Sequence, residues 1–240
     1  MDETATGIII RTNDTGEADR IVTLISRDAG LTKLYARAAR KSSRRFGGVL
    51  EAWATVGVTF KSKSNGLHQL NEASLVNGRS GIRGDLLRIA EASHACELAR
   101  LLSRENQPQR RLFDLLERFL DRVDAEGAGF GRTLMMELYF LSAAGYQPHV
   151  EECGECGKQS GAGARFFFSP DEGCLKCFEH KGYRDIQVGL KELELLKGEL
   201  KAGVGRKELE TLEQILGFFM ENIFGHPPKT RSFWREIRNG

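Results

Sequence analysis

The sequence lacks a run of apolar residues that is long enough to cross a membrane. A membrane helix needs about 18 consecutive apolar residues. The most apolar stretch, LMMELYFLSAAGY, is shorter and contains Glu137. The opening residues, MDETATG, are acidic and lack the basic-then-apolar order of a secretory signal. We therefore expect a cytoplasmic protein that does not associate with a membrane.

Sequence motifs of several enzyme classes are also absent. The chain contains no G-x4-G-K-[ST], no H-E-x-x-H and no G-x-S-x-G motif. The segment GAGFGR at 127–132 follows a predicted helix rather than a strand, so it does not fit a dinucleotide-binding turn. Acidic residues are spread along predicted helix faces beside Lys and Arg instead of gathering as magnesium ligands. We expect no enzymatic activity, and keep a nucleic-acid-processing enzyme as the weaker alternative.

Net charge is almost absent, which makes one local excess of cations conspicuous. The chain has 35 Lys plus Arg against 33 Asp plus Glu, yet the segment RAARKSSRRFGG at 37–48 has five cations, and no acid occurs between Asp28 and Glu51. A solvated loop is one interpretation. The other is contact with nucleic-acid phosphates, in which charge matters and base identity does not. Phe46, between Arg45 and two glycines, could then offer an exposed face to a base.

Two kinds of periodicity divide the chain. Residues 1–80 contain five short runs rich in Ile, Val, Thr and aromatics, separated by turn signals, which predict a small closed β-barrel. Residues 81–240 show apolar spacings of three and four, which predict helices, with Asp85 as a cap and Gly145 as a helix end. The helical part is interrupted at about 147–187 by a glycine-rich insertion. The predicted fold class is therefore α+β, with domains at 1–80 and 81–240.

The insertion contains four of the five cysteines, in the pattern C-x2-C-x17-C-x2-C. This spacing predicts a structural zinc site with four thiolate ligands, which leaves no position open for water or substrate. The alternatives are a redox dithiol pair or unrelated buried thiols. His149 and His180 could substitute as ligands, although we expect solvated loop histidines. The predicted ligands are Cys153, Cys156, Cys174 and Cys177.

The sequence resembles the RecO family of recombination-mediator proteins over essentially its whole length. The similar segments are GIIIRTNDTGEADRIVTLISRDAGLTKLYARAARKSSRRFGGVLEAW, GYQPHVEECGECG and FFFSPDEGCLKC. The resemblance implies an N-terminal OB-fold, a helical C-terminal domain and a four-cysteine zinc element. It places the DNA-binding surface on Arg11, Arg20, Lys33, Arg37, Arg40, Lys41, Arg44, Arg45 and Phe46.

The resemblance also implies a function and partners. Family members bind single- and double-stranded DNA, anneal complementary strands and act with RecR and often RecF. They help replace single-stranded-DNA-binding protein with the RecA recombinase, and the acidic C-terminal tail of that binding protein is a common partner. Such a protein acts at the bacterial nucleoid during repair. A protein adaptor with incidental DNA affinity is the alternative.

The C-terminal segment GHPPKTRSFW at 225–234 has two interpretations. Lys229 and Arg231 beside Phe233 and Trp234 could receive an acidic peptide with an aromatic end, because such a ligand needs cations around an apolar pocket. Alternatively, the segment is a final helix that packs on the others.

Overall fold

The computed structural model describes residues 2–46, 48–64, 66–105, 107–161 and 164–239, without the side chains of Ser43 and Arg44. The chain separates into two compact units, residues 1–128 with 236–240 and residues 129–235. None of the helices in the described ranges combines the length and the apolar character that a membrane span needs.

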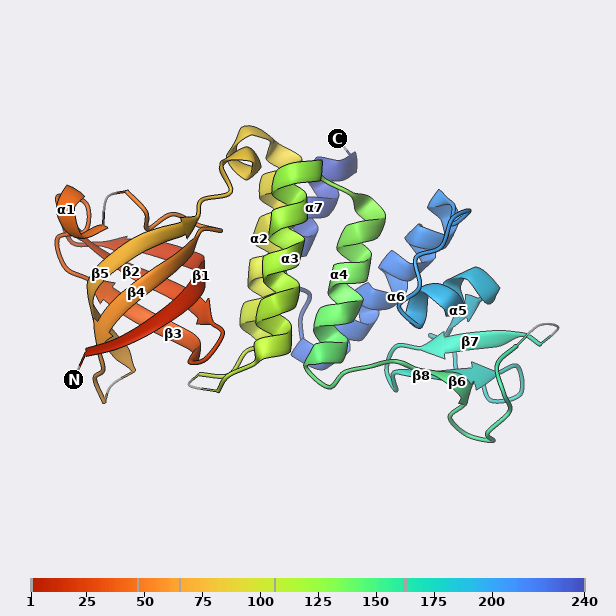
Figure 1. Cartoon of the computed structure of the whole chain (residues 1–240). Helices are drawn as coiled ribbons and strands as arrows, with labels where there is room; N and C mark the ends of the chain where they lie inside the picture. The colour runs from red at the N-terminus through yellow and green to blue at the C-terminus, as the bar shows by residue number, and fades with distance from the viewer. Residues whose placement is uncertain (1, 47, 65, 106, 162–163, 240) are drawn as a thin grey trace. The chain divides into compact units, whose positions relative to one another are not determined.

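The N-terminal part is a closed five-stranded barrel with the strand order β1-β2-β3-β5-β4 (Figure 1). Antiparallel pairing of β1 with β4 and parallel pairing of β3 with β5 close the barrel. The strands are β1 (Asp2–Thr15), β2 (Asp19–Ser26), β3 (Gly30–Ala36), β4 (Thr55–Lys61) and β5 (Leu67–Asn77). The predicted barrel is confirmed, and its strand order is that of an OB-fold.

Alternating side chains of these strands fill the barrel interior. In β3, Thr32, Leu34 and Ala36 are buried while Lys33 is exposed, as expected for a strand with one face toward a core. The short helix α1 (Ser43–Phe46) lies between β3 and β4 in the chain. The core consists of Ile9, Val22, Leu24, Leu34, Ala36, Phe46, Leu50, Ala54, Val56, Val58, Phe60 and Leu70.

A buried arginine joins the barrel to the helices of the first unit. Arg79 follows β5, has a left-handed backbone with φ 42°, and its side chain is fully buried. Its Nη1 donates to the carbonyl oxygen of Trp53 at 2.6 Å and to Thr55 Oγ1 at 3.0 Å, and its Nε donates to Asp121 Oδ1 at 2.7 Å. One guanidinium thus connects the start of β4 to a helix.

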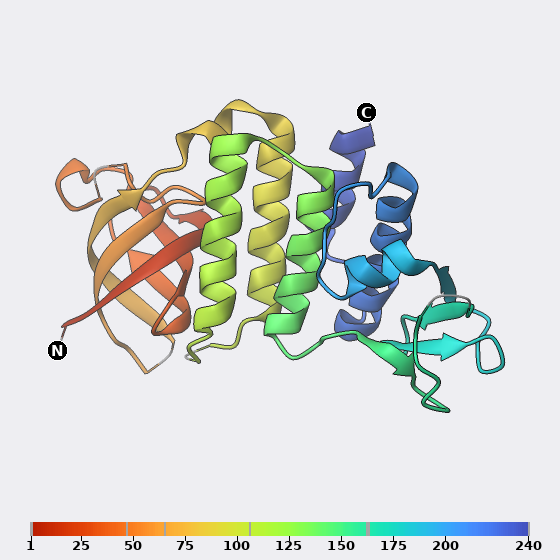
Figure 2. The ribbon, with the colours of Figure 1, turned by 45° about the vertical axis from the view of Figure 1, so that its right-hand side comes forward.

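That helix, α3 (Arg110–Glu126), lies beside α2 (Leu86–Leu102), as Figure 2 shows. A 3-10 helix, η1 (Ser80–Gly84), precedes α2. The predicted cap is confirmed, because Asp85 Oδ1 accepts the backbone N–H of Arg88 at 2.8 Å.

Gly30, at the start of β3, has a φ of +69°, and a Cβ there would lie 2.3 Å from the carbonyl oxygen of Gln107. Only glycine allows the chain to pass so closely.

The second unit combines helices with a four-stranded sheet of order β6-β8-β7-β9. Its sheet occupies the predicted insertion, and the sequence FFFS forms β7. The strands are β6 (His149–Cys153), β7 (Phe166–Ser169), β8 (Cys174–Cys177) and β9 (Ile186–Val188). The helices are α4 (Phe130–Ala143), α5 (Leu190–Leu196), α6 (Arg206–Phe224) and α7 (Lys229–Asn239), of which α7 ends beyond the unit.

The two compact units do not divide where the periodicity changes. The predicted domain boundary at residue 80 marks the change from strands to helices. By contacts, α2 and α3 group with the barrel and the division falls at 128 and 129. Arg79 supplies a physical reason, because its hydrogen bonds tie β4 to α3.

Replacing Arg79 should destabilise the first unit strongly. In Arg79→Met the aliphatic stem remains, but the carbonyl of Trp53 and the hydroxyl of Thr55 lose their donor. Each unpaired buried polar group costs about 1–3 kcal/mol, so the free energy of unfolding should fall by about 2–5 kcal/mol. Urea unfolding followed by circular dichroism measures the change.

The matched control is Arg110→Met. Arg110 donates to Asp28 at 2.9 Å, but both side chains are about 70% exposed (71% and 70%). Exposed pairs contribute about 0–1 kcal/mol. Equal destabilisation by the two substitutions would contradict the role given to Arg79.

Candidate nucleic-acid interface and candidate metal centre

The basic segment between β3 and β4, residues 37–48, is held in place by Asp19. The carboxylate of Asp19, at the start of β2, accepts the backbone N–H of Ala38 at 2.7 Å and the hydroxyl of Tyr35. Ala38 has a φ of 55°, so the chain turns sharply there. The N–H of Ala38 and then the phenol of Tyr35 lower the pKa of Asp19 below its usual range. We call residues 37–48 the basic loop.

Two of the predicted DNA-binding arginines hold the basic loop together. Arg20 donates to Asp14 at 2.8 Å and to the carbonyl oxygen of Leu50 at 3.0 Å, and only 22% of its side chain is exposed. Arg45 donates to the carbonyl oxygen of Arg37 at 2.6 Å and lies 4.9 Å above the Phe46 ring. The side chains of Arg20 and Arg45 thus form hydrogen bonds within the protein, so replacing either residue would disturb the loop.

Three other cations of the basic loop face solvent. Arg40 is half exposed; it donates to the carbonyl oxygen of Glu17 at 3.4 Å, and its Nε forms an ion pair with Asp14 at 3.8 Å. Arg37 and Lys41 are exposed, and neither side chain forms an ion pair or hydrogen bond within the described part of the chain. The side chain of Arg44 lies outside the described residues. A pocket of about 540 Å³ opens beside this group, lined in part by Arg20, Arg40 and Lys41.

Phe46 does not have the exposure that the sequence suggests. Its ring is 2% exposed and belongs to the barrel core. The expectation of an exposed face is therefore wrong, because the single turn of α1 directs the ring inward, where it anchors the basic loop. A buried ring offers no face to a base.

The two remaining cations, Arg11 and Lys33, lie on the outer surface of the barrel. Both pair in register with Thr23, from β1 and β3 respectively, so they share a row across three strands. Both are exposed; Arg11 donates to Asn13 at 3.2 Å, and Lys33 forms an ion pair with Glu105. The structure therefore places them on the barrel face and not in the basic loop.

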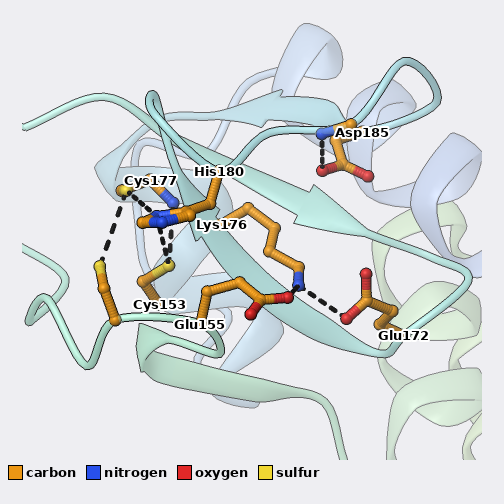
Figure 3. Close-up of polar contacts among 9 residues, drawn as sticks. Cys153, Glu155, Glu172, Lys176, Cys177, His180 and Asp185 are labelled. Atoms are coloured by element: carbon orange, nitrogen blue, oxygen red, sulfur yellow. Dashed lines mark hydrogen bonds and ion pairs between the residues drawn. The ribbon is translucent and has the colours of Figure 1, made fainter.

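A cluster of three thiols and one imidazole lies in the second unit (Figure 3). The ligand atoms of Cys153, Cys156, Cys177 and His180 all lie within 4.8 Å of one another. Cys156 Sγ is 3.9 Å from Cys177 Sγ, and His180 Nδ1 is 3.1 Å from Cys177 Sγ and 4.0 Å from Cys153 Sγ. The group could hold a metal ion.

The surroundings of the cluster favour thiolates at Cys153 and Cys177 but not at Cys156. A hydrogen bond from the backbone N–H of Lys158 lowers the pKa of Cys156, but burial and the contacts with Cys153 and Cys177 outweigh it and raise that pKa. Burial raises the pKa of Cys153, but hydrogen bonds from the backbone N–H groups of Cys156, Cys177 and Glu155 outweigh it and lower that pKa to about 6. Contact with His180 lowers the pKa of Cys177, and the same contact raises the pKa of His180. Thiolates are the form that binds metal.

The fourth predicted ligand, Cys174, is outside this cluster. Its Sγ contacts the backbone of Gly154, where an added Cβ would lie 2.7 Å away. The structure thus brings together three of the four predicted cysteines and adds His180, a possible substitute ligand that we expected to be a solvated loop histidine. The signal was present as a second short spacing, C-F-E-H at 177–180. His149, in β6, is exposed and outside the cluster.

The C-terminal segment is a helix whose key side chains are buried. Arg231 donates to Glu137 Oε1 at 2.8 Å and to the carbonyl oxygen of Glu213 at 2.8 Å, and Trp234 is fully buried with its ring centroid 6.0 Å from that of Phe130. The adjoining groove between α6 and α7, about 330 Å³, is lined by Glu210, Glu213 and Glu221 as well as by Arg231 and Arg235, and both arginines are already paired with Glu137 or Glu213. The packed helix is the alternative that the structure favours over an acceptor of acidic peptides.

The fold and the cluster together define an OB-fold protein with a helical region and a thiol-rich element. Its first 79 residues (1–79) match the family described as "Recombination protein O N terminal", and residues 83–232 match "Recombination protein O C terminal". The chain belongs to the RecO family of DNA repair proteins.

Individual relatives agree with this family over most of the chain. It is 35% identical to the DNA repair protein RecO of Syntrophotalea carbinolica over 97% of this chain and 94% of the relative. It is 36% identical to that of Pelobacter propionicus, over 96% and 95%. It is 41% identical to that of Anaeromyxobacter sp. (strain K), over 71% and 67%.

Removing the carboxylate of Asp19 should loosen the basic loop. In Asp19→Ala the N–H of Ala38 loses its acceptor, so trypsin should cut after Arg37, Arg40 or Lys41 several-fold faster, as mass spectrometry of the fragments would show. Glu17→Ala is the control, because Glu17 contributes only its backbone carbonyl to the loop. Equal cleavage of both variants would contradict the anchoring role.

Acidification should release the same anchor only at low pH. The pKa of Asp19 is depressed in the folded state, so its contribution is complete above the unfolded pKa of about 3.9 and is lost as the pH falls through the folded value. The protection factor of the Ala38 amide, measured by NMR hydrogen exchange, should therefore stay constant from about pH 7 to about pH 5. A fall within that range would contradict the assignment.

Proposed function

We propose that this protein is a recombination mediator that binds single- and double-stranded DNA through the basic loop and anneals complementary strands. With RecR and RecF it would help to load RecA onto DNA coated by single-stranded-DNA-binding protein. The observation that carries the DNA-binding step is the group of solvent-facing cations, Arg37, Arg40 and Lys41, on a loop that other residues hold in shape.

Solvent-facing cations on a fixed loop suit phosphate binding. A cation that already bonds to a protein carboxylate, as Arg40 does to Asp14, must give up that bond to contact a phosphate. In the described part of the chain, the side chains of Arg37 and Lys41 have no such bond to break. Binding of phosphates releases the counterions condensed on DNA, which supplies affinity without reading the bases. The pocket beside Arg40 and Lys41 gives a phosphate room to approach.

Annealing follows from the same electrostatics. Two complementary strands repel each other through their phosphates, and cations between them lower that repulsion. Because the contacts proposed are to phosphates alone, annealing should not depend on sequence. No covalent step is required, and we propose that the protein has no catalytic activity of its own.

The remaining parts of the proposal rest on the family. RecR, RecF and the acidic tail of single-stranded-DNA-binding protein are proposed as partners because the chain belongs to the RecO family. Arg231 and Trp234 are buried, so the site for an acidic tail is proposed elsewhere than on those side chains. A structural zinc ion in the second unit is part of the same proposal, since a tetrahedral site closed by four protein ligands supports folding rather than catalysis.

Replacing the two unpaired cations should weaken DNA binding without unfolding the barrel. In Arg37→Gln/Lys41→Gln, two phosphate contacts are lost. The slope of log affinity against log salt for single-stranded DNA should therefore become shallower by about 1.4, and affinity at 0.1 M salt should fall about 10- to 30-fold. Fluorescence anisotropy of labelled DNA over a salt series measures both quantities.

The matched control is Lys61→Gln/Lys63→Gln, which removes the same charge from exposed positions at the far end of β4 and in the turn after it. Equal losses in the two double variants would mean that affinity reflects total charge and not the basic loop. Unchanged binding by a folded loop variant would move the DNA surface elsewhere. Absence of binding and annealing by the wild type would favour the protein-adaptor alternative.

A further inference from the structure

We infer that His180, and not Cys174, is the fourth ligand of the metal centre, so that zinc is held by Cys153, Cys156, Cys177 and His180 while Cys174 remains a free thiol. This inference rests on the zinc part of the proposed function. It departs from the two C-x2-C pairs that the sequence presents.

The first support is the geometry of the cluster. Tetrahedral ligands at about 2.3 Å from zinc lie about 3.8 Å apart. The Cys156 to Cys177 distance is 3.9 Å, and His180 Nδ1 is 4.0 Å from Cys153 Sγ. The four atoms lie within 4.8 Å of one another, with His180 Nδ1 only 3.1 Å from Cys177 Sγ, so small shifts would bring them to the separation that a zinc ion imposes. Cys174 is not among them.

The second support is the conformation of the segment that contains Cys174. Residues Cys174–Cys177 form β8, which pairs with β7 at every position from Ser169↔Cys174 to Phe166↔Cys177. Successive side chains of a strand point to opposite faces, so positions three apart point in opposite directions. Cys174 and Cys177 therefore face away from each other. For both to bind one ion, β8 would have to turn, although it is hydrogen-bonded to β7 along its whole length.

Lys176 confirms which face Cys174 occupies. Lys176 is two positions from Cys174 and shares its face of β8. Its side chain is only 3% exposed, and its Nζ donates to Glu155 at 2.7 Å and to Glu172 at 2.6 Å (Figure 3). This ion-paired lysine fixes the strand orientation that directs Cys177 to the cluster.

The third support is that a tight turn follows the first ligand of each pair, Cys153 and Cys177. Cys153 ends β6 and Cys177 ends β8, and each is followed by a turn. In the first turn the N–H of Gly157 donates to the carbonyl of Cys153 at 2.9 Å; in the second, the N–H of His180 donates to the carbonyl of Cys177 at 3.1 Å. A turn after the first ligand brings the residue three positions later back to the same ion. The pairs are thus Cys153 with Cys156, and Cys177 with His180.

Cys174 has a different role in this arrangement. Its sulfur packs against Gly154 so closely that a side chain at 154 would collide with it. The sulfur of Cys174 therefore packs against the turn between Cys153 and Cys156. Being partly exposed and not ligated, it should react with an alkylating reagent while the metal protects the other three thiols.

The test compares Cys174→Ala with His180→Ala in the full chain. We expect Cys174→Ala to retain one zinc per chain at nearly wild-type affinity, measured by competition with a chromophoric chelator. His180→Ala should bind zinc about 100-fold or more weakly, because water replaces a protein ligand. His180→Cys should restore tight binding with four thiolates.

Two measurements on the wild type do not depend on any variant folding. In the Co²⁺-substituted wild type, the thiolate-to-cobalt absorption should correspond to three sulfur ligands. In the zinc protein, N-ethylmaleimide should label Cys174 before Cys153, Cys156 and Cys177, as peptide mass spectrometry would show. Buried Cys96, at 2% exposure, serves as the unreactive control.

Loss of zinc from Cys174→Ala with retention in His180→Ala, or a four-thiolate cobalt spectrum in the wild type, would overturn this ligand set and leave the zinc proposal intact. Wild-type protein that takes up no Zn²⁺, with Cys177 alkylated first, would overturn both. That second outcome would indicate a reactive thiolate–imidazole pair instead of a metal centre.

Discussion

The first unit depends on one buried guanidinium. Arg79 reaches the carbonyl of Trp53, the hydroxyl of Thr55 and the carboxylate of Asp121, so the barrel wall and α3 share a single hydrogen-bonding centre. A buried arginine is costly to desolvate, and only good geometry compensates for it. Its left-handed backbone adds a further local cost, which the surrounding contacts offset. The barrel is consequently part of a larger compact unit that includes α2 and α3, rather than an independent domain.

The cations in and beside the basic loop also differ in whether a protein acceptor lies within hydrogen-bonding distance. Arg20 donates to Asp14 and to the carbonyl oxygen of Leu50, and Arg45 donates to the carbonyl oxygen of Arg37. These hydrogen bonds help to determine the shape of the loop. Arg37 and Lys41 keep their charge in solvent, available to a ligand. Cations that look alike in the sequence thus divide into those bonded within the protein and those left in solvent, and the division depends on which carbonyl or carboxylate lies within reach.

In the second unit, strand alternation decides which sulfur atoms meet. The cysteine spacing suggests two equivalent pairs, but β8 is paired along its whole length and keeps Cys174 and Cys177 on opposite faces. The turn after Cys177 brings His180 to the cluster instead. Gly154 leaves room for the sulfur of Cys174 because it has no side chain. Lys176 fixes the orientation of β8 through its ion pairs with Glu155 and Glu172.

The sequence by itself determined the five strands of the barrel, the helices from Asp85 onward, the inserted element and the family, because periodicity, turn residues and motif spacing are local properties of the chain. It also located the basic loop and the thiol-rich element. Only the tertiary structure decided that Phe46 is core, that Arg20 and Arg45 are bonded internally, and that His180 joins the thiols. Those outcomes depend on which face of a strand or turn a side chain occupies and on partners far along the chain, which spacing alone does not contain.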